Sequence, residues 1–153
     1  MKNTIVISAF PACGKTYAFN NFQDSYSILD SDSSKFDKTY FPDNYIKHIK
    51  ENIRKVDIIF VSSHQSVREA LVANNIKFVT VYPNFDCKDE WLKRMKDRGN
   101  TEEFIKLQES KWDEWVKKVN PCGLKLYRLH KNQFITLSLL SDINNDYVNS
   151  ANI

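Results

Sequence analysis

Short apolar, β-branched runs alternate with amphipathic stretches along the whole chain. Each apolar run predicts a buried strand, and the runs cover residues 4–9, 27–30, 56–62, 77–82 and 124–129. The stretches between them predict helices over residues 15–21, 66–74, 88–97, 101–119 and 133–140, with a further helix beginning at Pro42 and Asp43. The tail from Asp142 is rich in Asn, Asp and Ser, and we expect it to fray.

This alternation of strands and helices predicts an α/β fold, in which helices cover both faces of a parallel sheet. The run at 56–62 is the most apolar stretch, so we expect it to form a central strand that is buried on both faces. A chain of 153 residues is long enough for one domain with a substantial core. We therefore predict a single domain over residues 1–153.

Composition and charge add little to this picture beyond excluding some classes. A net charge of +3 suits a protein that handles phosphates but is too small to indicate nucleic acid by itself. Three widely spaced cysteines form no disulfide or zinc pattern, so we expect free thiols in a reducing compartment. Since no apolar run approaches the roughly 20 residues of a membrane span and the first run reads as a strand rather than a signal peptide, we expect a cytoplasmic protein without membrane partners.

The first candidate for chemistry is the loop Ala9-Phe10-Pro11-Ala12-Cys13-Gly14-Lys15-Thr16, between the first strand and the first helix. It follows the phosphate-binding pattern G-x-x-x-x-G-K-[ST] except that Ala9 replaces the first glycine. Backbone amides, the Lys15 ammonium and the Thr16 hydroxyl are the groups that a nucleoside triphosphate and its Mg²⁺ require. The expected binding set is Pro11, Ala12, Cys13, Gly14, Lys15, Thr16 and Tyr17. The plain alternative is a chance Gly-Lys-Thr at a strand–helix turn.

Two further motifs follow. Asp30-Ser31-Asp32 comes at the end of the second predicted strand, where its carboxylates would face the loop. A polar turn would use the same residues.

Arg94 and Arg98 are one helical turn apart after the fourth strand, so they share a helix face. The alternative for this pair is an ordinary solvated basic helix.

With these motifs the chain resembles the small P-loop kinases of the nucleoside-monophosphate, shikimate, gluconate and polynucleotide kinase type, and small phage-encoded proteins of that kind. The resemblance covers most of residues 1–140 in layout. It implies a three-layer α/β/α sandwich with about five parallel strands in the order 2-3-1-4-5, and a helical lid over about residues 88–119. ATP and Mg²⁺ are the implied cofactors.

The resemblance also implies roles for individual residues. Lys15 would hold the β/γ-phosphates, while Thr16 and Asp32 would organise Mg²⁺. Asp32 would orient or deprotonate the acceptor with help from Asp30. Arg94 would bind the nucleotide by packing against adenine, and Arg98 would reach the transferring phosphate. The implied catalytic set is therefore Lys15, Asp32, Arg94 and Arg98.

The central strand departs from many P-loop proteins, because Val61-Ser62-Ser63-His64 contains no acid at its end. The missing acid counts against a mechanical ATPase, and it leaves Asp30 and Asp32 as the nearest candidates for binding a metal ion. Ser63, His64 and Arg68 follow the strand and are candidates for binding substrate at the sheet edge. Alternatively, His64 is a surface or capping residue, and Arg68 pairs with Glu69 or with a neighbouring helix.

The sequence thus predicts an ATP-dependent kinase acting on a small molecule, with a nucleoside or nucleotide favoured. Two alternatives stay open. One is a polynucleotide 5′-hydroxyl kinase, against which the modest charge counts. The other is a nucleotide-binding regulator without turnover, which Ala9 and the missing acid keep open. The residues leave the acceptor, the oligomeric state and the biological role undetermined.

Overall fold

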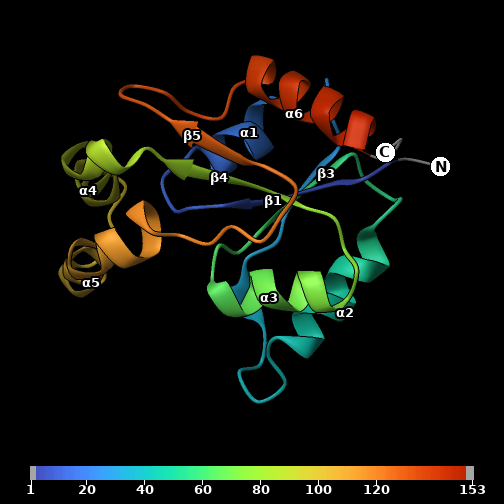
Figure 1. The fold of residues 1–153 in the computed structure, drawn as a ribbon, viewed down its shortest axis with the longest axis horizontal. Coiled ribbons are helices and arrows are strands. Elements are labelled where there is room, and N and C mark those ends of the chain that lie inside the picture. Colours follow the sequence, from blue (N-terminus) through green and yellow to red (C-terminus); the bar gives the residue numbers. More distant parts are fainter. Residues whose placement is uncertain (1–2, 151–153) are drawn as a thin grey trace.

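A computed structural model describes residues 3–150 of the chain. Its strands, β1 (Ile5–Ala9), β2 (Ile28–Asp30), β3 (Ile58–Val61), β4 (Val79–Pro83) and β5 (Leu126–Leu129), form one parallel sheet (Figure 1). The strand order is β2-β3-β1-β4-β5, with β1 between β3 and β4. The predicted α/β class, the parallel sheet of five strands and the strand order are confirmed.

Helices cover both faces of this sheet. The long helices are α1 (Lys15–Asn21), α2 (Asp43–Asn52), α3 (Gln65–Ala73), α4 (Lys88–Asp97), α5 (Glu102–Trp112) and α6 (Leu137–Ser150). Short turns of helix are η1 (Ser33–Lys35), η2 (Phe85–Cys87) and the π-helical η3 (Asp113–Lys117). Helices α1 and α6 lie on one face, and α2 and α3 on the other (Figure 1). None of the helices in the described part of the chain is long and apolar enough to cross a membrane.

The sheet is buried on both sides because its side chains alternate between two cores. Ile5, Ile7 and Phe60 contribute to the core beneath α1 and α6. Val6 and Ile59 contribute to the core beneath α2 and α3. Strands β1 and β3 are buried at every position, which explains why the sequence shows them as continuous apolar runs.

Helices α4 and α5 with η3 lie beyond the carboxyl ends of the strands, on the left of Figure 1. We call residues 88–117 the arm. Its second half is not the single helix expected over 101–119, because α5 gives way to a π-helical turn at Asp113. Such turns shift the helical phase by one residue. Trp112, the last residue of α5, and Val116, within the turn, are buried in the core, while Trp115 is half-buried.

The C-terminal segment contradicts the sequence prediction. A helix was expected over 133–140 and fraying from Asp142, but the described chain is helical from Leu137 to Ser150. Thr136 caps this helix, its Oγ1 accepting a hydrogen bond from the Leu139 amide at 3.1 Å. The polar residues of the tail have tertiary partners: Asp146 accepts from Lys125 Nζ and from the Tyr127 hydroxyl, at 2.9 and 2.6 Å. Propensity alone misses this helix because packing stabilises it.

The role of α6 in the core makes a testable prediction. Ile143 is fully buried, so Ile143→Ala should lower the free energy of unfolding by about 2–4 kcal/mol through lost burial and a residual cavity. Val148 lies on the same helix but is 44% exposed, and Val148→Ala should cost less than about 1 kcal/mol. Urea unfolding of both variants measures the difference. Equal, small effects would mean that α6 is not packed on the sheet.

Candidate functional site

The loop after β1 presents a row of backbone N–H groups that have no intramolecular partner. The first hydrogen bond into α1 runs from the Ala18 amide to the Gly14 carbonyl at 3.0 Å, and the amides of residues 12–17 donate to nothing in the described chain. Ala12 and Gly14 have positive φ angles of 64° and 103°. Backbone that alternates between right- and left-handed conformations turns successive amides inward and forms a concave site for anions.

Alanine at the first position of the loop introduces no strain. Ala9 is the last residue of β1, is fully buried, and is absent from the residues with positive φ. The advantage of glycine, its access to positive φ, is therefore not needed there. It is needed at Gly14, whose φ of 103° an L-residue adopts only with strain.

Lys15 is held over the same loop. Its Nζ donates to the carbonyl of Ala9 at 3.2 Å, which places the ammonium beside the unpaired amides. Burial lowers the pKa of Lys15, and the neighbouring Asp30 carboxylate opposes this shift. A poorly hydrated cation surrounded by free N–H donors attracts an anion strongly.

Asp30 and Asp32 come to this site from β2, as predicted, but in different environments. Asp30 is half-buried, and this burial raises the pKa of its carboxyl group. The positive charge of Lys15 opposes the rise in pKa, whereas the negative charge of Asp32 adds to it. Asp32 is exposed and caps η1, its Oδ1 accepting from the Ser34 amide and hydroxyl at 2.9 and 2.7 Å. Those hydrogen bonds hold the pKa of Asp32 below its ordinary value. The polar-turn alternative therefore describes Asp32 in part, although Asp32 still lines the cleft described next.

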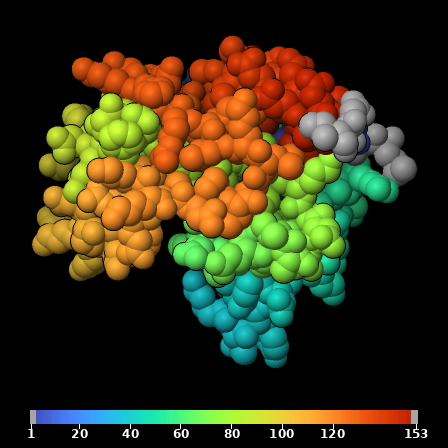
Figure 2. All heavy atoms as spheres, in the orientation of Figure 1, coloured from blue at the N-terminus to red at the C-terminus, as the bar shows by residue number. Residues whose placement is uncertain are grey.

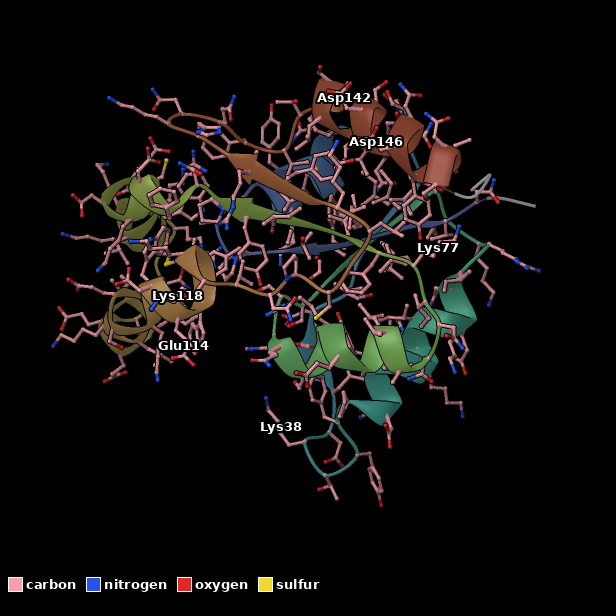
Figure 3. All side chains as sticks on the ribbon, in the orientation of Figure 1. Lys38, Lys77, Glu114, Lys118, Asp142 and Asp146 are labelled. Carbon is pink, nitrogen blue, oxygen red and sulfur yellow. The ribbon has the colours of Figure 1, made fainter. Side chains whose placement is uncertain are left out.

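A cleft of about 970 Å³ opens beside these residues. One wall is made by Lys15, Thr16, Asp30 and Asp32, and the other by α5 and η3 of the arm. Figure 2 shows the surface hollowed between the arm, in gold and orange, and α3, in green. In Figure 3, Glu114 and Lys118 stand on the arm side, and Lys38 projects from the loop that precedes α2. The loop, the carboxylates and the arm thus meet at the carboxyl edge of the sheet, where open α/β sheets bind ligands.

Arg68 reaches this cleft from α3 and is only 5% exposed. Its Nε donates to the Ser63 carbonyl at 3.1 Å, and its Nη1 donates to the Asn120 carbonyl. The expected alternative, a salt bridge with Glu69, does not form, because Glu69 accepts instead from Gln65 at 2.7 Å. No ion pair between Arg68 and a carboxylate occurs in the described chain. A buried cation that has only neutral partners favours an anionic ligand.

Ser63 and His64 also line the cleft. The Ser63 carbonyl accepts from Arg68 and from the Tyr82 hydroxyl, the latter at 3.0 Å, so its backbone is held firmly. His64 is exposed at the N-cap position of α3, but its side chain makes no capping hydrogen bond, so the surface alternative describes it better than the capping one. Desolvation and the nearby cations Lys38 and Lys15 lower the pKa of His64, which keeps its imidazole neutral at pH 7.

The two arginines predicted for the lid are separated by the structure. Arg98 lines the cleft, and its Nε donates to the side-chain carbonyl of Asn100. Arg94 does not line it: its guanidinium lies 3.7 Å from the Trp91 ring centre and 3.8 Å from that of Phe134. The face that was expected to pack against adenine therefore packs against the protein's own ring. The role assigned to Arg94 needs correction, because both faces of its guanidinium are covered.

Arg94 instead ties the arm to the loop. It donates to the Ala12 carbonyl at 3.1 Å and to the Gln133 carbonyl at 2.7 Å, and pairs with Glu90 at 2.7 Å. A guanidinium can serve these partners at once because its donors lie in one plane. Arg94 thus positions the loop rather than contacting the cleft.

Cys13 and Tyr17, both predicted to bind the nucleotide, face away from the cleft. Cys13 is fully buried within the core, and burial raises the pKa of its thiol to about 12. Tyr17 is 61% exposed and packs edge-on against Phe22 at 5.8 Å. Any contact between these residues and a phosphate would use the backbone amide.

Thiol labelling tests this arrangement. Cys122 is exposed, whereas Cys13 and Cys87 are buried, and burial raises the pKa of Cys87 to about 11. Because the thiolate is the reacting form, iodoacetamide at pH 7.5 should modify Cys122 at least about 100-fold faster than the other two. Peptide mass spectrometry of the native and the urea-unfolded chain measures the rates. Rapid modification of Cys13 in the native chain would contradict the buried placement.

Several residues of the cleft were not predicted from the sequence. Gln108 and Trp115 line it from the arm, and Lys118 lines it from the position directly after the arm. Trp112 and Trp115 are three residues apart, a spacing that would place them on one face of a continuous α-helix. The π-helical turn begins between them, and no local signal in the sequence marks it.

Neither the protein-family models nor the curated proteins that were searched contain a match to this chain.

Proposed function

We propose that this protein is an ATP-dependent phosphotransferase whose acceptor is a nucleoside or nucleotide. The observation that carries the proposal is a single cleft lined by Lys15, Thr16, Asp30 and Asp32 on one side and by Arg68 and Arg98 on another. Unpaired amides and Lys15 suit the β/γ-phosphates of ATP. The buried Arg68 suits an anionic group of the acceptor.

Thr16 and Asp32 fit a magnesium ion that accompanies ATP. Mg²⁺ is commonly held by one or two protein oxygens together with phosphate oxygens, so a larger protein cluster is not required. No group of three or more His, Cys, Asp or Glu side chains that could hold a metal occurs in the described residues. When bound, the ion neutralises charge on the phosphates.

The two carboxylates suit different tasks. Asp32 has one oxygen engaged by Ser34 and a lowered pKa, which favours a permanently ionised metal ligand. Asp30 accepts no hydrogen bond from the described residues, has a raised pKa and is close enough to Lys15 for their charges to interact. A general base works best when its pKa approaches the working pH. We therefore assign proton acceptance from a hydroxyl acceptor to Asp30, and metal binding to Asp32.

Transfer would then proceed with the chain's own groups in place. The amides of the loop and Lys15 orient the triphosphate, and Arg68 holds the acceptor. Asp30 would take the proton of the attacking hydroxyl as its oxygen bonds to the γ-phosphorus of ATP. The bond from that phosphorus to the β–γ bridging oxygen would break at the same time and release ADP, while Lys15 and Arg98 would stabilise the charge on the transferring group. Arg94 links the arm to the loop by donating a hydrogen bond to the Ala12 carbonyl.

A labelled-phosphate assay tests the proposal. Full-length protein is incubated with γ-labelled ATP, Mg²⁺ and a panel of nucleosides, nucleoside monophosphates and 5′-hydroxyl oligonucleotides. Label in one of the mononucleosides or mononucleotides supports it. Label only in oligonucleotides would indicate a polynucleotide 5′-hydroxyl kinase. If ATP raises the melting temperature but no acceptor is labelled, the protein is a nucleotide-binding regulator and the proposal fails.

A further inference from the structure

The wall of the cleft that belongs to the arm carries an unsatisfied side chain. Gln108 lines the cleft from α5 and is only 6% exposed, and its Oε1 is buried without a hydrogen-bond partner in the described chain. Leaving such an acceptor unpaired destabilises the folded chain, because the oxygen loses its hydrogen bonds to water and gains none in return. Trp112, one turn later on the same helix, is also buried, but its indole N–H has a partner in the Phe85 carbonyl at 2.9 Å.

The amide of Gln108 is free to present its oxygen to the cleft. The Oε1 atom has no hydrogen-bond partner in the described chain, so no hydrogen bond at this oxygen has to break when the amide rotates about its last side-chain bond. That torsion is broad in side-chain amides. A ligand in the cleft that offers an N–H donor would thus meet an acceptor with no competing partner.

The surroundings of Gln108 suit a flat ring. Phe104 lies one turn before it on α5, and Trp115 follows from η3; both line the cleft. Phe10 and Tyr82 line the cleft as well, with their ring centres 5.2 Å apart. Aromatic side chains stack on the faces of planar heterocycles, and a hydrogen bond at the ring edge then selects among them.

From this geometry we propose that the arm wall is a base-recognition site, in which Gln108 Oε1 accepts a hydrogen bond from a ring or exocyclic N–H of the acceptor's nucleobase. Gln108 is then the residue that determines which base is preferred. This inference rests on the proposed function for the identity of the cleft but concerns binding rather than transfer. It places the sugar-phosphate end of the acceptor toward Arg68 and the base toward Phe104 and Trp115.

Binding measured without ATP tests the proposal. Full-length wild-type protein is titrated calorimetrically with AMP, GMP, CMP, UMP and dTMP, and with ribose 5-phosphate as a ligand that lacks the ring. At least one nucleotide should bind about ten-fold or more tightly than ribose 5-phosphate. Gln108→Met keeps the side-chain volume. In this variant the ratio of the affinity for that nucleotide to the affinity for ribose 5-phosphate should fall about ten-fold, while the affinity for ribose 5-phosphate itself stays within about two-fold of the wild type.

A matched control and a stability measurement separate recognition from structure. Gln65 lines the same cleft but is exposed and already donates to Glu69 at 2.7 Å, so Gln65→Met should change the preference less than about two-fold. Gln108→Met should unfold at the same or higher urea concentration, because it removes an unpaired polar atom; a merely structural glutamine would destabilise the chain when replaced.

Two results would overturn the proposal: a preference for nucleotides that persists in Gln108→Met, or wild-type protein that binds ribose 5-phosphate as tightly as any nucleotide. Base preference that disappears in Gln108→Met, in a protein that labels no acceptor, would support the recognition site while removing the kinase proposal. Failure of the base-recognition site can therefore be distinguished from failure of the proposed kinase function.

Discussion

Lys15→Met is expected to lower the rate of phosphoryl transfer by at least about 100-fold. Lys15 Nζ lies 3.2 Å from the Ala9 carbonyl, beside amides with no partner in the described chain, so under the proposed function it would contact the phosphates of a triphosphate. Removing one preorganised donor to a charged transition state typically costs about 2.7–4 kcal/mol. Initial rates with γ-labelled ATP and the best acceptor of the panel measure the loss.

The substitution should not unfold the protein. Burial lowers the pKa of Lys15, which means that the folded chain holds this charge at a cost. At pH 7 the melting temperature of Lys15→Met should therefore equal or exceed that of the wild type, while the gain in melting temperature with ATP should be lost. Lys96→Met, on the exposed face of α4, should leave the rate within about two-fold of the wild type. A Lys15→Met variant that retains its rate would remove the loop from the mechanism.

Asp30→Asn is expected to lower transfer to a hydroxyl acceptor by about 100-fold or more, in the range typical for loss of a general base. The carboxylate of Asp30 is half-buried and influenced by Lys15, and its pKa is raised above the usual value. Transfer by the wild type should therefore decline on acidification at a pH above the ordinary pKa of an aspartate, as Asp30 takes up its proton. That acid limb of the pH–rate profile should be absent from the residual activity of Asp30→Asn.

Asp32→Asn should fail in a different way. If Asp32 binds the metal, the variant should need more Mg²⁺ for half its maximal rate and should recover at high Mg²⁺, whereas Asp30→Asn should not. Asp37→Asn is the matched control, because Asp37 accepts from the Thr39 amide at 2.9 Å as Asp32 does from Ser34, but it does not line the cleft. If instead Asp32→Asn is inactive at every Mg²⁺ concentration and Asp30→Asn is active, Asp32 is the base.

For Asp30 and Asp32, part of the candidate site could be predicted from the sequence and part could not. Their type and position after the second strand marked them as candidates, and the strand order that brings β2 beside β3 places them at the cleft. Their division of labour was not predictable, because it depends on the Ser34 hydrogen bonds to Asp32 and on the burial of Asp30 near Lys15.

What the sequence alone determined was local or periodic. Continuous β-branched runs have to be buried on both faces, and their alternation with amphipathic segments leads to a parallel sheet. The Gly14-Lys15-Thr16 turn needs only its own backbone and the strand before it, so its position could be read directly. The boundaries of α1 and α4 follow from the same local signals and match the structure.

The tertiary structure decided everything that depends on contacts between distant segments. Tyr127 and Lys125 hold Asp146, which keeps a polar tail helical. Phe134 covers the guanidinium of Arg94, although it lies 40 positions further along the chain (134 minus 94), and so turns a predicted nucleotide contact into a structural link. A π-helical turn follows the buried Trp112, and Trp115 within that turn lines the same cleft as Gln108. These outcomes follow from which surfaces remain available after the sheet forms, and spacing along the chain does not contain that information.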